Sequence, residues 1–438
     1  MIEIAKSIVS PILSLIFLTL GNGFFTTYIT VRLQAEGYEA GTIGYITAFY
    51  YAGLLLGSFR AEKAISQIGH IRSFSVFASS TAVLILLQAF WINPISWAFL
   101  RFGAGICMAG LFVTVESWLL YKGTTKTRGK VLSIYMCSFY AAQGIGQYFL
   151  DLADPMTMIP FTIAALFSAI SILPVSLTKS AAPIISEPSC LTLKKLIRIS
   201  PLGMLGSLIG GMILSAVYGL IPIYANSLGL NVSEIATLMS MVIFGGLLLQ
   251  WPIGQVSDHI DRRKVILFTC FVSILLSLSI ALFGGIHHLL LLGLMGLFGG
   301  FASAVYPLSV SHTCDQVKKD DVVSATSGLL LTYGSGAVIG PLLAPIAMYL
   351  LGPSGLFIYF MVILGALLLF CTLRLSFQTP TPEEEKLTHT NIPRTSPIAS
   401  EMDPRIEEKA EKDSEEKKLT FYSRKNASSL DNWNKKQP

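Results

Sequence analysis

Charged residues are scarce in this sequence. Asp, Glu, Lys and Arg make up 13% of its 438 residues, whereas soluble domains contain about 25%. The 57 charged residues (31 basic and 26 acidic) are also unevenly spread, because residues 1–376 hold 34 and residues 377–438 hold 23. The first part is too apolar to fold in water, and the second cannot bury a core. This excludes a set of soluble domains and predicts a membrane part with a charged cytoplasmic tail, 377–438, that we expect to be disordered.

Cysteine and catalytic motifs are also scarce. The six cysteines show no CxxC pair and no Cys/His metal spacing, so we predict neither a metal site nor a structural disulfide. HExxH and GxSxG are missing, and residues 123–130 resemble a P-loop only with a glycine spacing one residue too long. The sequence therefore predicts no enzyme, no cofactor and no ATP-driven pump.

Long apolar runs are what the sequence has in quantity. Hydrophobic residues make up 53% of the chain, and the mean hydropathy is +0.64. A helix needs about 20 apolar residues to cross the hydrocarbon core of a bilayer. We count twelve such runs, at 8–30, 42–63, 73–92, 96–120, 130–150, 157–177, 202–225, 234–256, 265–284, 288–312, 325–350 and 355–375. The predicted fold class is an all-α membrane protein with twelve transmembrane helices.

Basic residues between the runs fall on one side. If the N-terminus is cytoplasmic, eighteen Lys and Arg residues lie on the cytoplasmic side and only Arg32 on the other, with Arg101 inside a run. Cytoplasmic loops of membrane proteins carry such an excess. We therefore predict that both termini are cytoplasmic. The net charge of +5 then reflects topology, and we expect no nucleic-acid partner.

The chain also repeats itself weakly. The longest break between runs, 178–200, divides the helices six and six, and Gly53-Leu-Leu-Leu recurs 193 residues later as Gly246-Leu-Leu-Leu. We predict two six-helix pseudo-repeats, 1–177 and 201–376, joined by a cytoplasmic loop. Duplicated bundles of this kind are typical of secondary transporters whose site lies between the halves near mid-membrane.

The loop after the eighth run carries a family motif. Its sequence, Gly-Gln-Val-Ser-Asp-His-Ile-Asp-Arg-Arg, resembles the cytoplasmic signature GxxxD-R-x-G-R-R/K of the major facilitator superfamily at Gly254, Asp258, Arg262 and Arg263. Glycine permits close helix approach, and an aspartate accepts hydrogen bonds from arginines. We expect these four residues to form a cytoplasmic latch; a plain basic loop is the alternative.

Two ionisable residues lie within the fourth run. Arg101 begins an RxxxG sequence similar to one whose arginine, in the superfamily, is associated with proton coupling or substrate contact. A cation inside an apolar helix is costly unless it faces a cavity or a partner, although Arg101 could also reach the outer interface. Glu116, about 22 Å further along the axis, could pair with Arg128 or act as a protonatable coupling carboxylate. The whole RFGAG, VESW and RGK pattern resembles a little-characterised group of bacterial inner-membrane permeases.

Uncharged polar residues within the runs are candidates for solute contacts. A pocket of Tyr, Gln and Asn suits an amphipathic organic solute, although a single Tyr can also anchor a helix at the membrane interface. The candidates are Asn22, Tyr28, Tyr51, Gln143, Gln147, Tyr218, Gln250 and Tyr333. Drug antiporters of the superfamily carry a proline where this chain has Gln147, which favours solute uptake over drug efflux.

These patterns predict a monomeric secondary active transporter of a bacterial inner membrane. It would move a small organic solute by alternating access, driven by an ion gradient, for which our hypothesis is protons. Its expected partners are the solute, protons and the lipid bilayer. Efflux of drugs or metabolites by proton antiport is one alternative, and a transporter-derived sensor that signals through the charged tail is another.

Overall fold

The structure is a computed structural model that describes residues 2–122, 127–177, 193–318, 321–375, 386–390 and 393–398. Its regular elements in these ranges are all helices. The first half contains α1 (Ile2–Ala35), α2 (Ala40–Ile68), α3 (His70–Phe90), α4 (Pro94–Lys122), α5 (Arg128–Gly146), the 3-10 helix η2 (Gln147–Leu152), α6 (Ile159–Ile170) and α7 (Ile172–Ser176). The second half contains α9 (Pro201–Ser227), α10 (Val232–His259), α11 (Arg262–Phe283), α12 (His288–Gln316), α13 (Val322–Leu351) and α14 (Gly355–Leu375), after the short α8 (Leu193–Ile199).

The predicted all-α membrane fold is confirmed. Eleven of the described helical segments are long and apolar enough to cross a bilayer, with α6 and α7 counted together. The predicted fifth run forms α5 and continues as η2. Because α5 begins with Arg128 and Lys130, it is not one of those eleven, and the count of twelve spans stays a prediction.

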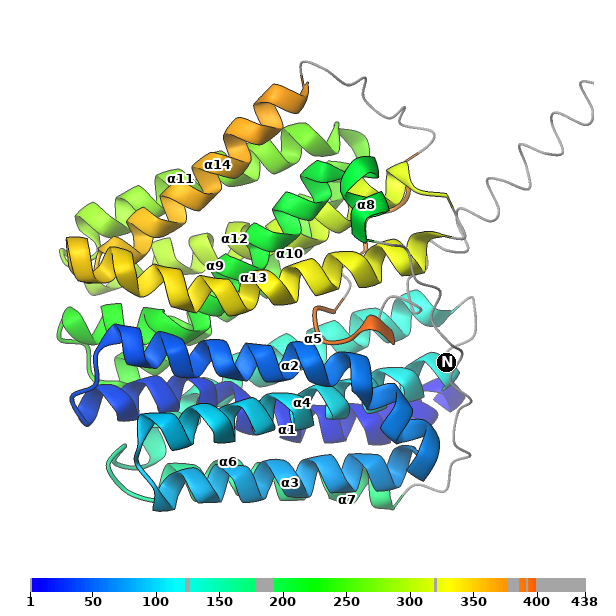
Figure 1. Cartoon of the computed structure of the whole chain (residues 1–438), viewed down its shortest axis with the longest axis vertical. Helices are drawn as coiled ribbons and strands as arrows, with labels where there is room; N and C mark the ends of the chain where they lie inside the picture. The colour runs from blue at the N-terminus through cyan, green and yellow to red at the C-terminus, as the bar shows by residue number, and fades with distance from the viewer. Residues whose placement is uncertain are drawn as a thin grey trace, which may run out of the picture.

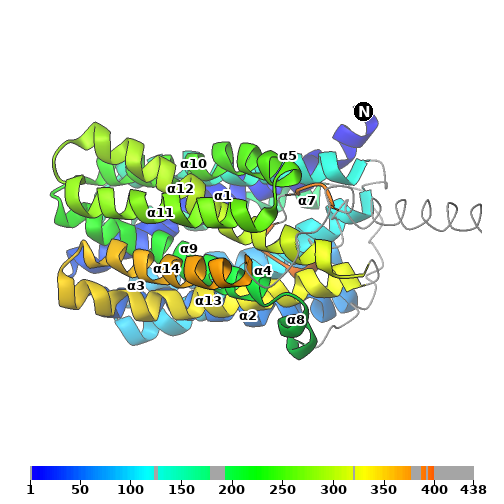
Figure 2. The same ribbon diagram turned by 90° about the horizontal axis from the view of Figure 1, so that it is seen from above.

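The helices lie side by side, and their ends define the two ends of the bundle (Figures 1 and 2). We call the end at which α1 begins and α14 finishes the tail end, and the other the opposite end. The described basic residues expected on the cytoplasmic side lie at the tail end, whereas Arg32 lies at the opposite end in an ion pair of 2.7 Å with Glu36. The described chain therefore keeps the predicted segregation of charge.

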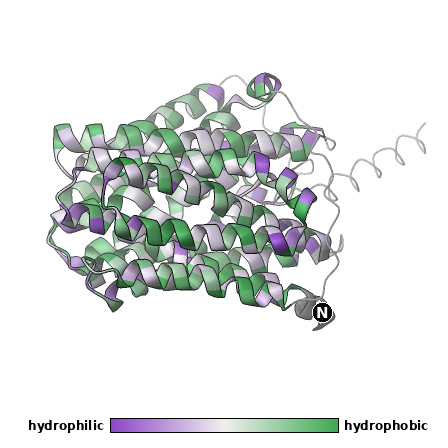
Figure 3. Cartoon of the chain, turned by 60° about the horizontal axis from the view of Figure 1, so that its bottom comes forward, coloured by the Kyte–Doolittle hydropathy of each residue, from purple (hydrophilic) through white to green (hydrophobic). Residues whose placement is uncertain are grey.

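Hydrophobic residues occupy much of every long helix of the bundle, as the green ribbon in Figure 3 shows, and many of them are exposed. Leu248, Trp251, Leu282 and Val362 each expose more than 60% of their surface, although they lie in the middle or final turns of long helices. Such exposure would be costly in water at 25 cal/mol/Å² or so, but it costs nothing against lipid chains. The outward faces are therefore suited to the bilayer.

Glycines bring two pairs of helices into backbone contact, one pair in each half. A Cβ at Gly53 of α2 would lie 2.0 Å from the carbonyl oxygen of Phe102 in α4. In the second half, a Cβ at Gly245 of α10 would lie 1.8 Å from the carbonyl oxygen of Gly296 in α12. The Gly-Leu-Leu-Leu repeat lies at these two crossings, but the close backbone contact in the second half is made by Gly245, the residue before Gly246.

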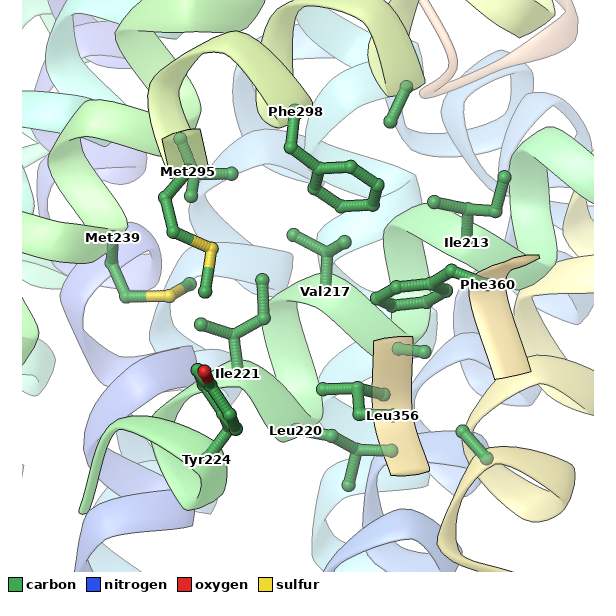
Figure 4. Packing of buried hydrophobic residues seen from close by; sticks show 14 of the residues in the cluster. Ile213, Val217, Leu220, Ile221, Tyr224, Met239, Met295, Phe298, Leu356 and Phe360 are labelled. Carbon is green, nitrogen blue, oxygen red and sulfur yellow. The ribbon is translucent and has the colours of Figure 1, made fainter. Parts of the chain in front are cut away.

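The second half has a packed apolar interior. In the second half, α9 presents Val217, Ile221 and Tyr224 to rings and thioethers from α10, α12 and α14 (Figure 4). The ring of Phe298 lies 5.3 Å from that of Phe360, in a stacked arrangement. This packing holds α9 in place, one of the two helices of the second half that line the cavity described below.

The two halves touch directly towards the opposite end. The Thr30 hydroxyl donates to the carbonyl of Gly219 at 2.9 Å, and the Ser240 hydroxyl to that of Gly144 at 2.8 Å. A Cβ at Gly44 would lie 2.1 Å from the carbonyl oxygen of Pro341, so α2 and α13 are in backbone contact there. The arrangement closes the opposite end of the interface between the halves.

Candidate functional site

A cavity of about 1030 Å³, counting its open part, lies between the halves. Its walls come from α1, α2, α4 and α5 on one side and from α9 and α13 on the other. Aromatic side chains dominate the lining, with hydroxyl and amide groups among them. Five of the predicted solute-contact residues line it: Asn22, Tyr51, Gln143, Tyr218 and Tyr333.

Three of the predicted solute-contact residues lie elsewhere. Tyr28 is at the opposite end, where its hydroxyl donates to the carbonyl of Pro155 at 2.9 Å. Gln147 is buried and ties α5 to α1, since its amide donates to the carbonyl of Gly23 at 2.9 Å. Gln250 lies behind the cavity wall, where it donates to the Tyr140 hydroxyl at 3.1 Å. The presence of a polar residue in an apolar run does not show whether its side chain lines the cavity or ties two helices together.

Arg101 is buried, with 3% of its surface exposed, so it does not extend to the outer interface. Its guanidinium carbon lies 4.1 Å from the ring centroid of Tyr50 and 5.7 Å from that of Phe25. The Tyr50 hydroxyl reaches Asn22 in the cavity wall at 3.4 Å. The Nε of Arg101 has no hydrogen-bond partner among the described residues. The Arg101 guanidinium thus packs against aromatic faces, and Tyr50 lies between it and the cavity.

Glu116 is completely buried in the inner part of α4. Its Oε1 accepts a hydrogen bond of 2.5 Å from the hydroxyl of Tyr135, a residue that lines the cavity. Its carboxylate also accepts from the hydroxyls of Thr395 and Ser396. Among the described residues its partners are therefore hydroxyl groups, and the alternative of an ion pair with Arg128 is not what the structure has.

Arg262 joins two carboxylates at the tail end of the second half. Its Nε lies 2.5 Å from Asp315 in α12, and its Nη1 lies 3.3 Å from Asp258 in α10. Arg262 and Asp315 each expose 2% of their side chains. Asp258 and Arg262 were predicted latch residues; Asp315 was not, because it stands alone after an apolar run.

The other two latch positions have different neighbours from those expected. A Cβ at Gly254 would lie 2.1 Å from Cδ2 of His389, so this glycine admits the tail rather than a neighbouring helix. Arg263 pairs with Asp261 at 2.7 Å, and Asp261 also accepts from the Arg263 backbone N–H at 3.0 Å, as the N-cap of α11. Burial alone would raise the pKa of Asp261, but the hydrogen bonds and charge of Arg263 hold it below its ordinary value.

The structure describes part of the tail, 377–438, that we predicted to be disordered, and the rest of the tail lies outside the described residues. We call residues 386–390 and 393–398 the tail segment; both stretches are described, and most of their residues are buried, although Thr388 is exposed. Pro393, Arg394 and Thr395 line the same cavity as the helices. The high charge content of the whole tail predicted a solvated chain. It gave no sign that this short, weakly charged stretch contacts residues inside the bundle.

Comparison with known proteins identifies the family. The model of the Major Facilitator Superfamily matches residues 5–299 and 203–403. The chain belongs to the major facilitator superfamily. The predicted membership of this superfamily is therefore confirmed.

Curated relatives share the family and most of the length. The chain is 29% identical over 335 residues to the uncharacterised MFS-type transporter YcaD of Escherichia fergusonii, covering 75% of this chain and 85% of the relative. It is 29% identical over 376 residues to the uncharacterised MFS-type transporter Ent638_1421 of Enterobacter sp. (strain 638), covering 84% and 95%.

Solved structures share the fold at low sequence identity. The nucleoside transporter NupG has a TM-score of 0.65 at 14% identity, covering 86% of this chain and 100% of that chain. A D-xylose-proton symporter has a TM-score of 0.65 at 13% identity, covering 86% and 99%. Its membership of the superfamily, rather than these distant structures, makes the chain a multi-pass membrane protein and a secondary transporter, not an enzyme.

Proposed function

We propose that this major facilitator transporter moves a small organic solute by alternating access, with Glu116 as the proton-coupling carboxylate. The observation that carries the proposal is the environment of Glu116. It is completely buried, and its described partners are three hydroxyl groups. A buried carboxylate with no cation beside it is costly when ionised, and protonation removes that cost.

Solute binding and proton binding are coupled in this proposal through Tyr135. Its hydroxyl contacts Glu116 and its ring lines the cavity. A solute that shifts Tyr135 would change the hydrogen bonds available to the carboxylate, and so the balance between its protonated and ionised forms. The D-xylose-proton symporter that shares the fold makes this class of mechanism reasonable for the bundle.

The cavity supports an uncharged or amphipathic organic solute. We propose that Asn22, Tyr51, Gln143, Tyr218 and Tyr333 contact it, since aromatic faces with a few hydroxyl and amide groups suit such a molecule. Arg101 would act from behind Tyr50, by holding that ring against the cavity. We assign Arg101 a positioning role rather than direct contact.

We propose a bacterial inner membrane as the location, with the tail end in the cytoplasm. The basic residues gathered at that end support this orientation, and both chain termini would then be cytoplasmic. The halves meet at the opposite end and enclose the cavity towards the tail end. The conformation is therefore the inward-facing one in this proposal. We propose that the transporter acts as a monomer, because the described residues of one chain line the cavity from both halves.

The test begins with a solute library screened by thermal shift on the detergent-solubilised protein. For a solute that raises the unfolding temperature, uptake into proteoliposomes is then measured with and without a pH gradient. We expect uptake that rises when the gradient is imposed, and that falls in an Arg101→Ala variant. Transport indifferent to the gradient would overturn proton coupling, and unimpaired Arg101→Ala transport would overturn the role of Arg101.

Direction is tested in cells. We propose uptake, because Gln147 replaces the proline of the antiporter motif and its amide instead ties α5 to α1. A deletion strain should grow poorly on one nutrient and keep its drug resistance. Increased drug susceptibility with normal growth on single nutrients would point to efflux instead.

A further inference from the structure

The first stretch of the tail segment is bound by the charged residues of the second half. The backbone N–H of Leu387 donates to Asp315 Oδ1 at 3.0 Å, and its carbonyl accepts from Arg262. The backbone N–H of His389 donates to Asp258 Oδ1 at 2.7 Å. Leu387 is 1% exposed. The charges of the predicted latch therefore hold the tail's own backbone as well as one another.

Arg394 lies at the centre of the contact, between aromatic faces. Its Nη2 donates to the carbonyl oxygen of Ser303 at 2.5 Å. Its guanidinium carbon is 5.8 Å from the ring centroid of Tyr306 and 5.9 Å from that of Tyr333. A cation over aromatic faces is attracted by their negative quadrupoles, and the carbonyl adds a charge-assisted hydrogen bond. Tyr140 and Tyr218 line the same cavity as Arg394 and Tyr333.

The last residues of the tail segment bind the first half. Thr395 and Ser396 donate their hydroxyls to the carboxylate of Glu116. Ile398 is 2% exposed and packs in a small apolar cluster of α2 and α4. That cluster consists of Ala61, Ile65 and Val113.

The tail segment therefore bridges the two halves at the tail end, across the side of the cavity away from their direct contacts. We propose that the cavity contains a binding site for this segment of the chain itself. Its central feature is a guanidinium box formed by the rings of Tyr306 and Tyr333 and the carbonyl of Ser303. The seated segment fills space that a solute would need and takes the hydrogen bonds of Glu116. This inhibitory consequence rests on the proposed function, because it holds only if this cavity is the transport site.

Tethering makes such a ligand effective even when its intrinsic affinity is low. Ten residues, 376–385, separate the end of α14 from the segment, and a short linker gives an effective concentration in the millimolar range. A solute must therefore compete with a ligand that is always present. The tail would set a threshold on solute concentration for transport.

Binding of the tail segment in the cavity is tested first, by measuring how well an introduced cysteine is protected from a thiol reagent. In the full chain, Ile398→Cys is reacted with a small charged thiol reagent, and each cysteine is followed by mass spectrometry, with the buried Cys270 as an internal reference. We expect much slower reaction at position 398 than in the same protein unfolded in SDS. Adding Arg394→Ala should speed that reaction about tenfold, because the cation–π and hydrogen-bond contacts are lost.

The matched control is Arg405→Ala, which makes the same charge change in the same tail outside the tail segment. It should leave the reaction at position 398 unchanged. Rapid reaction in the chain that retains Arg394, or equal acceleration by both arginine substitutions, would overturn the proposal.

The chemistry of the site is tested with a peptide added in trans. A fluorescent peptide of residues 386–398 is titrated into full-length Arg394→Ala protein, whose own segment should leave the site open. We expect binding by the natural sequence, weaker binding by an Arg394→Lys peptide, and at least a tenfold loss with Arg394→Ala. Equal binding of all three would show that no guanidinium box exists.

Inhibition is tested by transport of a solute found in the thermal-shift screen. Arg394→Ala should lower the solute concentration that gives half-maximal transport, and Arg405→Ala should not. If the thiol and peptide results hold but this concentration is unchanged, the inhibitory role is wrong. Transport by the natural chain that does not depend on the pH gradient would instead overturn the proposed proton coupling, without contradicting the binding site for the tail segment.

Discussion

At the scale of single residues, Arg262 offers a direct test of the charged contacts. It lies between Asp258 and Asp315, and both it and Asp315 are almost fully buried. Replacing one member of a buried ion pair leaves the other charge without compensation, at a cost of about 3–5 kcal/mol. We expect Arg262→Met to lower the free energy of unfolding by about this amount, measured by thermal or chemical unfolding in detergent.

Two further variants separate this cause from a general effect of losing a basic residue. Lys264→Met, at an exposed position of the same helix, should change stability little. The double variant Arg262→Met/Asp315→Leu should recover much of the loss, because the uncompensated carboxylate is gone. A double variant no better than Arg262→Met alone would contradict this account of the pair.

Asp261 gives a prediction in pH. Its pKa is held below the ordinary value by Arg263, so the contact stabilises the folded state above the unfolded pKa of about 3.9. That contribution is lost as pH falls through the folded pKa. Asp261→Asn should therefore lower the unfolding temperature at pH 7 and have a smaller effect at pH 3. Equal effects at both pH values would exclude the charged pair as the cause.

At the scale of helices, the crossing of α2 and α4 depends on Gly53. A Cβ there would lie 2.0 Å from the Phe102 carbonyl oxygen, and backbone atoms cannot move aside cheaply. Gly53→Ala should cost at least about 3 kcal/mol of stability. Gly365→Ala is the matched control, because nothing lies within 4 Å of a Cβ at that position of α14; it should be neutral or stabilising by up to about 1 kcal/mol.

The helices themselves were predictable because length and apolarity decide whether a segment spans a bilayer. The repeat at Gly53 and Gly246 pointed to the region of both crossings, although the close backbone approach in the second half is at the neighbouring Gly245. The fifth run was harder to assess, because α5 carries basic and amide side chains and passes into η2 at Gln147.

The site was predictable only in part. Five of the eight candidate solute contacts line the cavity, but Tyr28, Gln147 and Gln250 bind backbone or buried groups instead. A helical run fixes which residues are polar but not which way each one faces after packing. The partners of Glu116 from the tail could not be found at all, because they lie about 280 residues away in a stretch without periodicity.

At the scale of the whole molecule, the two halves meet at one end and leave a cavity that extends towards the other. Two ionisable residues of the helices lie near it: Arg101 lies against Tyr50 and Phe25, and Glu116 lies among hydroxyl groups near the tail end. Alternating access in this account exchanges which end is closed. Proton coupling then requires that Glu116 change its protonation when solute is bound.

The most direct test measures protons and solute together. Proteoliposomes with a trapped pH-sensitive dye are given the solute identified by thermal shift, and proton movement and solute exchange are both recorded. The control is Glu234→Gln, because Glu234 belongs to a capping box in which glutamine can serve. We predict solute-driven proton movement in the natural chain and in Glu234→Gln, and its loss in Glu116→Gln with solute exchange retained. Proton movement at the natural rate in Glu116→Gln, or solute transport without protons in the natural chain, would contradict the account.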